Sequence, residues 1–276
     1  MSISQQIIDK FITALNSAEN PPIFLYPCSN NDDLNNRYAS SRKVFNRKFD
    51  FMPPLIIQVR DTEQVATAIK IASEHNIEIT VRSGGHDHEG ECVATGKVLI
   101  DFSLMNNVQL HENFIKIYCG EDKLIRQVTI QPGARFSTIK PVLDKAWLGI
   151  PHGTCQSVAI AGYTMGGGWG PWTRMYGMAC ERLYGATIVL GDGSIKYLGT
   201  SAIYNKEKRN SDNQGDFDIE GGQLLWALRG GGGLSYGIVT EFFYEPFELP
   251  ELPISFVLTS YEFPVLGKIS AVSIIK

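Results

Sequence analysis

Residues 155–170 read Cys-Gln-Ser-Val-Ala-Ile-Ala-Gly-Tyr-Thr-Met-Gly-Gly-Gly-Trp-Gly, so an apolar run is followed by a dense group of glycines. Glycine lets backbone N–H groups approach a ligand closely and hydrogen-bond its phosphate oxygens, and it also permits positive φ. We therefore expect this stretch to contact a phosphate-containing ligand.

Two further loops share this arrangement, in which one element enters, glycines follow and another element leaves. They are Arg82–Gly90, which reads Arg-Ser-Gly-Gly-His-Asp-His-Glu-Gly, and Arg229–Gly237, which reads Arg-Gly-Gly-Gly-Gly-Leu-Ser-Tyr-Gly. The chain has 27 glycines in 276 residues, above the average usage of about 7%. A single glycine run is often only a tight turn, but three in one chain favour a dinucleotide or another long anionic ligand.

Two common nucleotide sites are disfavoured by the motifs. No GxGxxG opens a helix directly after the first strand, which argues against a Rossmann site, and no GxxxxGK[ST] is present, which excludes a P-loop. His86 lies within the first glycine loop and Cys155 precedes the second. From the residues alone, His86 is either a solvated side chain or a functional one, and Cys155 is either a small core residue or a nucleophile.

The composition is that of a folded protein. Hydrophobic residues make up 43% and charged residues 20% of the chain, which is long enough for one large domain or two ordinary ones. With 25 basic and 29 acidic residues the net charge is −4, so the sequence shows no electrostatic footprint of nucleic-acid binding.

The N-terminus lacks a basic segment followed by an apolar one, and no apolar stretch approaches the roughly 18 residues of a membrane span. We expect no signal peptide, no membrane partner and, by default, a cytoplasmic protein, although secretion without a cleaved signal would leave no trace. The five cysteines are odd in number, widely spaced and without a CxxC pair. We therefore expect neither a disulfide framework nor a metal site.

The first part of the chain has the pattern of an α/β unit. Residues 1–20 predict a short amphipathic helix, and residues 55–59 predict an apolar strand. Asp61 is placed to begin the next helix, whose Val65, Ala68, Ile69 and Ala72 share one face. Strands are expected next at 77–81 and 98–101.

The second part is richer in adjacent strands. A helix is expected over 136–147, with Ile139, Leu143 and Trp147 on one face. Asp-Gly at 192–193 predicts the turn of a hairpin. The remaining expected elements are strands at 115–119, 124–130, 186–190, 195–198 and 237–244 and a helix at 218–228.

The chain resembles flavoprotein oxidases of the berberine bridge enzyme and oligosaccharide oxidase type. Four segments carry the resemblance and occur in this order: Arg82–His86, Cys155–Gly162, Gly166–Gly170 and Trp226–Gly233. These oxidases have the PCMH-type FAD-binding fold of the vanillyl-alcohol-oxidase superfamily, and the resemblance runs from about Tyr38 to Pro246. It implies an α+β fold of two α/β subdomains, about 40–110 and 111–246, with FAD between them. Residues 1–39 would be an N-terminal helix and polar lead-in, and 247–276 the start of a substrate domain.

In this family a loop histidine is bonded to the flavin 8-methyl carbon and a cysteine to flavin C6. The resemblance implies that His86 and Cys155 hold FAD bicovalently. It also implies that the pyrophosphate region contacts Arg82, Ser83, Gly84, Gly85 and Asp87. The ribityl–pyrophosphate channel would be lined by Val158, Gly162, Gly167, Gly168 and Gly170. The flavin or adenine would meet the backbone of Ile238 and Val239. Val158 matches a position that controls oxygen access, whereas Tyr163 departs from the histidine that is frequent in relatives.

The implied activity is an oxidase that takes hydride from an alcohol or carbohydrate and passes electrons to oxygen, giving hydrogen peroxide. Family members run to nearly twice this length, and their second half supplies the catalytic base. We therefore expect a truncated chain whose exposed apolar surface favours self-association. The alternatives are a flavin-binding module without turnover, an inactive remnant, or a non-covalent FAD reductase like the enolpyruvyl reductase of cell-wall synthesis, against which His86 and Cys155 argue.

Overall fold

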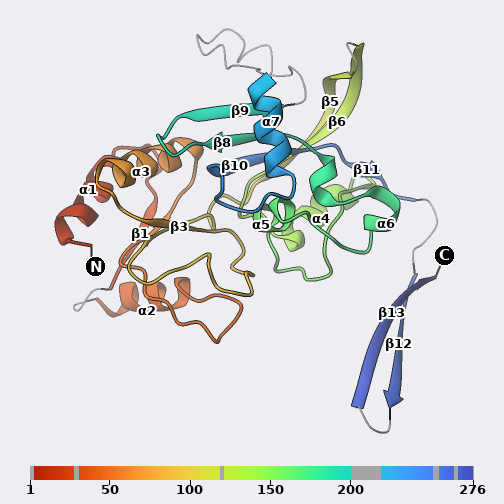
Figure 1. The fold of residues 1–276 in the computed structure, drawn as a ribbon, viewed down its shortest axis with the longest axis horizontal. Coiled ribbons are helices and arrows are strands. Elements are labelled where there is room, and N and C mark those ends of the chain that lie inside the picture. Colours follow the sequence, from red (N-terminus) through yellow and green to blue (C-terminus); the bar gives the residue numbers. More distant parts are fainter. Residues whose placement is uncertain are drawn as a thin grey trace.

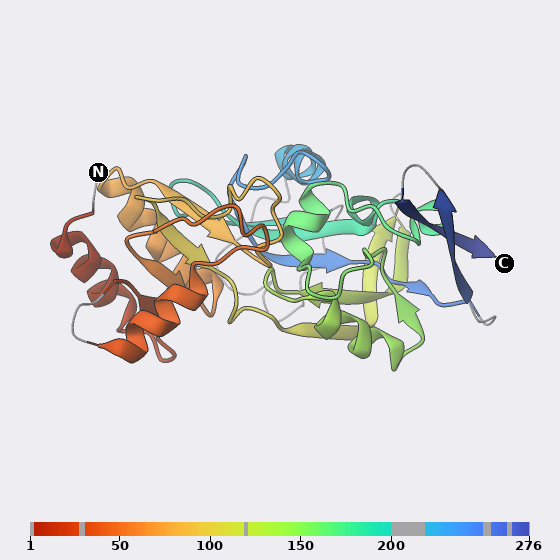
Figure 2. The same cartoon turned by 90° about the horizontal axis from the view of Figure 1, so that it is seen from below.

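The computed structural model describes residues 3–27, 31–118, 121–199, 219–250, 255–263 and 267–275. They form two lobes that lie side by side (Figures 1 and 2), and the α+β class predicted from the sequence is confirmed. Cys28 and Cys119 lie outside the described residues, and the three described cysteines are free thiols. Among the described helices, none has the length and apolar character needed to cross a membrane.

The first lobe is a sheet with helices on both faces. The strand order is β1 (Ile23–Leu25), β2 (Ile56–Gln58), β4 (Val98–Asp101) and β3 (Ile79–Arg82). β2, β4 and β3 are parallel, while β1 pairs antiparallel with β2. The helices of this lobe are α1 (Gln5–Leu15), α2 (Asp32–Ser41) and α3 (Thr62–Glu74).

Alternate strand residues pack against different helices. Ile57 joins the core that contains residues of α1 and α3, whereas its neighbour Ile56 packs with Tyr38 of α2. This burial on both faces explains why the strands read as apolar runs without polar alternation. Because β1 and α1 pack into the same lobe, the described part of residues 1–39 is continuous with it.

The predicted start of α3 is confirmed. The Asp61 carboxylate accepts a hydrogen bond from the Gln64 backbone N–H at 2.8 Å, and the Gln64 side chain accepts one from the Arg60 N–H at 2.9 Å. The first contact satisfies an N–H group that the first turn of a helix leaves free, and the second fixes the residue before the cap. The predicted apolar face of the helix is buried, as expected.

The second lobe contains an antiparallel sheet. Its order is β5 (Val108–Tyr118), β6 (Glu121–Ile130), β10 (Ile238–Tyr244), β8 (Leu183–Val189) and β9 (Ile195–Gly199). Its main core includes residues of α4 (Phe136–Asp144), α5 (Ile160–Met165) and α7 (Ile219–Leu228). The shorter elements of this lobe are β7 (Leu148–Gly149), α6 (Thr173–Tyr176), a 3₁₀ turn (Ala179–Arg182) and β11 (Phe247–Glu248). β12 (Ser255–Phe263) and β13 (Gly267–Ile275) form a separate antiparallel hairpin that projects from the second lobe (Figure 1).

The two lobes are packed against each other. Val189 at the end of β8 and Ile238 at the start of β10 are buried in the core of the first lobe. The Thr62 hydroxyl of α3 donates a hydrogen bond to the Thr240 hydroxyl of β10 at 2.9 Å. These contacts fix the position of α3 against the second sheet.

The prediction that Trp147 lies on the buried face of a helix is wrong. α4 ends at Asp144, and Trp147 has φ of 55° with 69% of its surface exposed. The chain must leave the helix to form β7, and the Leu249 N–H donates to the Trp147 carbonyl at 2.9 Å. The pairing of β7 with β11 therefore ends the helix before Trp147, although the spacing of apolar residues predicted that the helix would continue.

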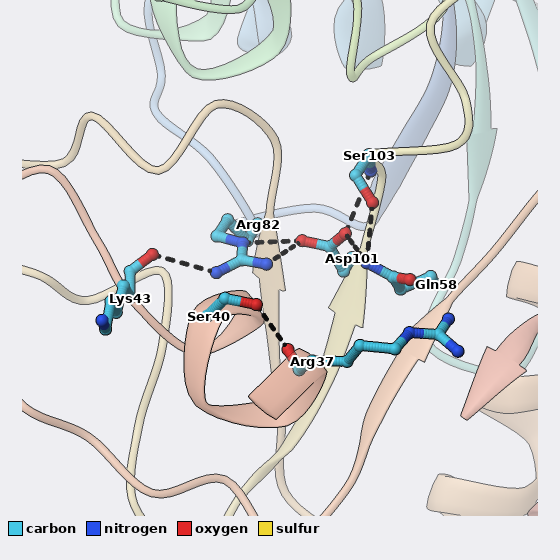
Figure 3. Close-up of polar contacts among 7 residues, drawn as sticks. All are labelled: Arg37, Ser40, Lys43, Gln58, Arg82, Asp101 and Ser103. Atoms are coloured by element: carbon cyan, nitrogen blue, oxygen red, sulfur yellow. Dashed lines mark hydrogen bonds and ion pairs between the residues drawn. The ribbon is translucent and has the colours of Figure 1, made fainter. Parts of the chain in front are cut away.

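A buried ion pair lies where the first glycine loop leaves its sheet (Figure 3). Arg82 ends β3 and donates from Nε to Asp101 Oδ2 at 2.6 Å, while Nη1 donates to the Lys43 carbonyl at 3.2 Å. The other Asp101 oxygen accepts from the Ser103 N–H at 3.1 Å. Because both side chains are more than nine-tenths buried, each depends on the other for compensation of its charge.

Asp101→Ala should lower the free energy of unfolding by about 3–5 kcal/mol, because it leaves the Arg82 guanidinium buried without its carboxylate. Asp50→Ala is the matched control: Asp50 pairs with Arg42, but its side chain is 75% exposed, and its loss should cost at most about 1 kcal/mol. Urea unfolding followed by circular dichroism measures both. Equal losses in the two variants would contradict this assignment.

Candidate functional site

A cavity of about 610 Å³ lies between the two lobes, where the three glycine loops meet. The first lobe contributes residues 83–88, and the second contributes residues of the segment 158–165 and of 233–239. The first loop follows the carboxyl end of β3, the edge of a parallel sheet at which ligands usually bind. The size falls in the range of roughly 300–1,000 Å³ that is typical of ligand and cofactor pockets.

The structure brings most of the candidate binding residues together at this cavity. The candidates that line it are Ser83, Gly84, Gly85, His86, Asp87, Val158, Gly162, Ile238 and Val239. Arg82, Cys155, Gly167, Gly168 and Gly170 are not among the lining residues.

Arg82 supports the loop from inside the protein. Its guanidinium is held by Asp101 and by the Lys43 carbonyl, so its charge is compensated within the first lobe. The geometry therefore assigns Arg82 to anchoring the first glycine loop, and not to a side-chain contact with a ligand.

The later glycines of the second loop allow close packing. A Cβ at Gly168 would lie 2.4 Å from the Ala179 Cβ, and one at Gly170 would lie 2.0 Å from the His152 carbonyl oxygen. Gly162 differs, because a Cβ there would meet nothing within 4 Å. Gly162 therefore offers open space to a ligand, whereas Gly168 and Gly170 serve the fold.

Gly84 allows the first loop to touch the second lobe. A Cβ at this position would lie 2.8 Å from the Ala159 backbone nitrogen, closer than non-bonded atoms can approach. The facing segment forms a turn, in which the Val158 N–H donates to the Cys155 carbonyl at 3.3 Å, and it is held against α4 because the Phe136 and Ser137 N–H groups donate to the Val158 and Gln156 carbonyls at 3.0 Å each. The backbones of the two lobes are thus in direct contact at Gly84 and Ala159.

This contact brings the two candidate nucleophiles to one hydroxyl group. His86 Nε2 lies 2.8 Å from Ser157 Oγ, and Cys155 Sγ lies 3.2 Å from the same oxygen. The His86 ring stacks on Phe45 with centroids 4.5 Å apart. Cys155 itself is exposed, so the pair stands at the rim of the cavity.

Both groups are in forms suited to nucleophilic attack. Burial lowers the pKa of His86, and the positive charges of Arg135 and His88 lower it further. Hydrogen bonds from the Ser157 side chain and backbone lower the pKa of the Cys155 thiol. At neutral pH the imidazole is therefore neutral, and the thiol loses its proton more readily than an ordinary cysteine.

One lining residue has an unused hydrogen-bonding group. The Tyr163 hydroxyl is buried and finds no partner among the described residues, and burial raises its pKa, so that it stays protonated. A buried hydroxyl without a partner is costly and is normally satisfied by a ligand or by water.

Sequence reasoning missed Ser157 and Phe45. Ser157 gave no signal of its own, because its meeting with Cys155 depends on the turn in which the Val158 N–H donates to the Cys155 carbonyl at 3.3 Å. Phe45 carried no such signal, since it lies outside the glycine loops and its contact with His86 arises only from the tertiary fold.

Comparison with known proteins places the chain in a family of FAD-binding proteins. The profile of the FAD binding domain family matches residues 53–199, more than half of the chain. The chain is 32% identical over 220 residues to glucooligosaccharide oxidase of Sarocladium strictum, covering 79% of this chain and 38% of that protein. It is 28% identical to chitooligosaccharide oxidase of Gibberella zeae, covering 75% of this chain and 37% of that one.

Solved structures agree with this result. The glucooligosaccharide oxidase of Acremonium strictum, described with a 6-S-cysteinyl, 8α-N1-histidyl FAD, matches with a TM-score of 0.69 and 28% identity, covering 92% of this chain and 46% of that one. For 6-hydroxy-D-nicotine oxidase of Arthrobacter nicotinovorans the TM-score is 0.66 at 24% identity, covering 87% and 45%, a likeness of fold. The chain spans about two fifths of the length of these curated relatives.

Cys155 should be the most reactive of the three described cysteines. In the flavin-free chain at pH 7.5, iodoacetamide should modify Cys155 at least about a hundredfold faster than Cys92, because burial raises the pKa of the Cys92 thiol to about 11. Peptide mass spectrometry after timed quenching measures both rates. Modification of Cys92 or Cys180 before Cys155 would contradict the described environments.

Proposed function

Because the chain belongs to the family of FAD binding domains and has its PCMH-type α+β fold, we propose that it is the flavin-binding part of an FAD-dependent oxidase. The substrate is an alcohol or a carbohydrate, which gives up hydride, and oxygen takes the electrons to form hydrogen peroxide. The observation that carries this proposal is the meeting of His86 and Cys155 at Ser157, on the rim of the cavity between the lobes.

The residues present fit FAD. Gly84, Gly85 and Gly162 line the cavity, and a Cβ at Gly162 would meet nothing within 4 Å, so the backbone there is open to a long anionic ligand. When bound, FAD supplies the redox chemistry, and the protein supplies orientation and electrostatics. The division into subdomains of about 40–110 and 111–246, with FAD between them, stays part of this proposal; the core of the first lobe also contains residues of α1 as well as Val189 and Ile238.

We propose two covalent links, from His86 to the flavin 8-methyl carbon and from Cys155 to flavin C6. In each link a hydrogen on the protein atom and a hydrogen on the flavin carbon are replaced by an N–C or S–C bond. The two protons and two electrons released are taken up by oxygen, which becomes hydrogen peroxide. The neutral imidazole and the acidified thiol are the forms that such bond formation needs.

The oligosaccharide oxidases among the relatives favour a carbohydrate as the substrate of this chain.

Val158 lines the same cavity as His86, which supports its proposed part in oxygen access. The exposed tryptophans Trp147, Trp169 and Trp226 offer apolar surface for association with further protein.

The test is the mass of tryptic peptides from the denatured protein. His86 falls in peptide 83–97 and Cys155 in peptide 146–174, so bicovalent FAD should join the two into one flavin-containing species. His86→Ala should leave flavin on 146–174 alone, and Cys155→Ala should leave it on 83–97 alone. The double variant should lose all covalent flavin.

Cys180→Ala serves as the control, because this thiol is buried away from the rim and should not change the joined species. Recovery of both peptides unmodified from the wild-type protein grown with riboflavin would overturn the proposed attachment. So would a joined species in either single variant.

A further inference from the structure

We propose that Ser157 is a positioning residue whose single hydroxyl makes His86 and Cys155 ready for bond formation together. This inference rests on the proposed attachment of FAD to the two side chains. It follows from the placement of one oxygen within 2.8 Å of His86 Nε2 and 3.2 Å of Cys155 Sγ.

A hydroxyl has only one proton, so the chain of hydrogen bonds through Ser157 has a direction. When His86 Nε2 carries a proton, it donates to Oγ, and Oγ donates to the Cys155 sulfur. The sulfur is then stabilised as a thiolate, and His86 Nδ1 keeps a free lone pair. In the reverse direction the thiol donates to Oγ and Oγ donates to Nε2, which leaves the proton of the neutral ring on Nδ1 and blocks both nucleophiles.

The two arrangements differ by one proton. The thiol proton passes to Ser157 Oγ, the serine proton passes to His86 Nε2, and the Nδ1 proton leaves to solvent. Loss of a single proton therefore prepares both nucleophilic atoms. Without the hydroxyl, the two groups would titrate separately.

The surroundings hold this geometry in place. Phe45 stacks on the face of the His86 ring, and Ser157 occupies its Nε2 edge, so Nδ1 is the nitrogen left for attack. Arg135 Nη1 donates to the Ser157 carbonyl at 2.8 Å. The flanking carbonyls of Gln156 and Val158 accept backbone hydrogen bonds from the start of α4. The hydroxyl is thus presented by a segment that is fixed on three successive residues.

The charged groups nearby favour the ready arrangement. Arg135 and His88 are the groups whose positive charges oppose protonation of His86. Cys155 is exposed, and its stabilisation comes chiefly from the Ser157 hydroxyl and secondarily from backbone hydrogen bonds. Removal of the hydroxyl should therefore affect the thiol more than any other single change at the rim.

The experiment compares Ser157→Thr, which keeps the hydroxyl, with Ser157→Val, which has nearly the same shape without it. Both are made in the full chain, produced flavin-free in a riboflavin-starved host. The rate of iodoacetamide alkylation at Cys155 is measured against pH, and long-range ¹H–¹⁵N spectra show which His86 nitrogen carries the proton. At pH 7 we expect alkylation about three- to tenfold slower in Ser157→Val, because the smaller thiolate fraction is partly offset by higher nucleophilicity.

Ser157→Thr should follow the wild-type pH profile and keep the Nε2–H form, whereas Ser157→Val should show a mixture of the two tautomers. Ser137→Ala is the matched control, since Ser137 lies in the first turn of α4, beside the segment of Ser157, and has an exposed side chain. Identical profiles in Ser157→Val and wild type would overturn the inference. Added FAD then separates the two proposals: failure of the wild type to acquire covalent flavin counts against the proposed function, while the thiol and imidazole measurements still decide the role of Ser157.

Discussion

The site depends on the close approach of two backbones, at Gly84 and Ala159. Any side chain at position 84 would collide with the Ala159 nitrogen at 2.8 Å, so the first glycine loop could not reach the second lobe. The hydrogen bond between His86 and Ser157, which are 71 residues apart in the chain, exists only because of this contact. The absence of one methyl group therefore decides whether the two candidate nucleophiles meet.

Each side of this contact is anchored in its own lobe. Behind the loop, the buried Arg82–Asp101 pair fixes the point where the chain leaves the parallel sheet. Behind the facing segment, Arg135 and the first residues of α4 hold three consecutive carbonyls. Because both partners are anchored by these hydrogen bonds, His86 and Cys155 lie close together beside a cavity that the two lobes share.

Local features of the fold were predictable where local physics decides them. The Asp61 cap, the buried face of α3 and the hairpin of β8 and β9 follow from short-range patterns, and the structure confirms them. Trp147 was mispredicted because strand pairing ended the helix early. The glycine loops and the resemblance to flavoprotein oxidases indicated His86 and Cys155. The position of Ser157 between them and the ion pair of Arg82 with the buried Asp101 depend on the tertiary structure, and the sequence gives only weak signals for them.

The most direct test of the account is the visible spectrum of the purified chain before and after acid precipitation and washing. Flavin absorbance should stay with the washed, denatured protein if His86 and Cys155 hold FAD covalently, as proposed. Absorbance that passes entirely into the supernatant would contradict covalent attachment. A protein that carries no flavin absorbance in either fraction would contradict the assignment of this cavity to FAD.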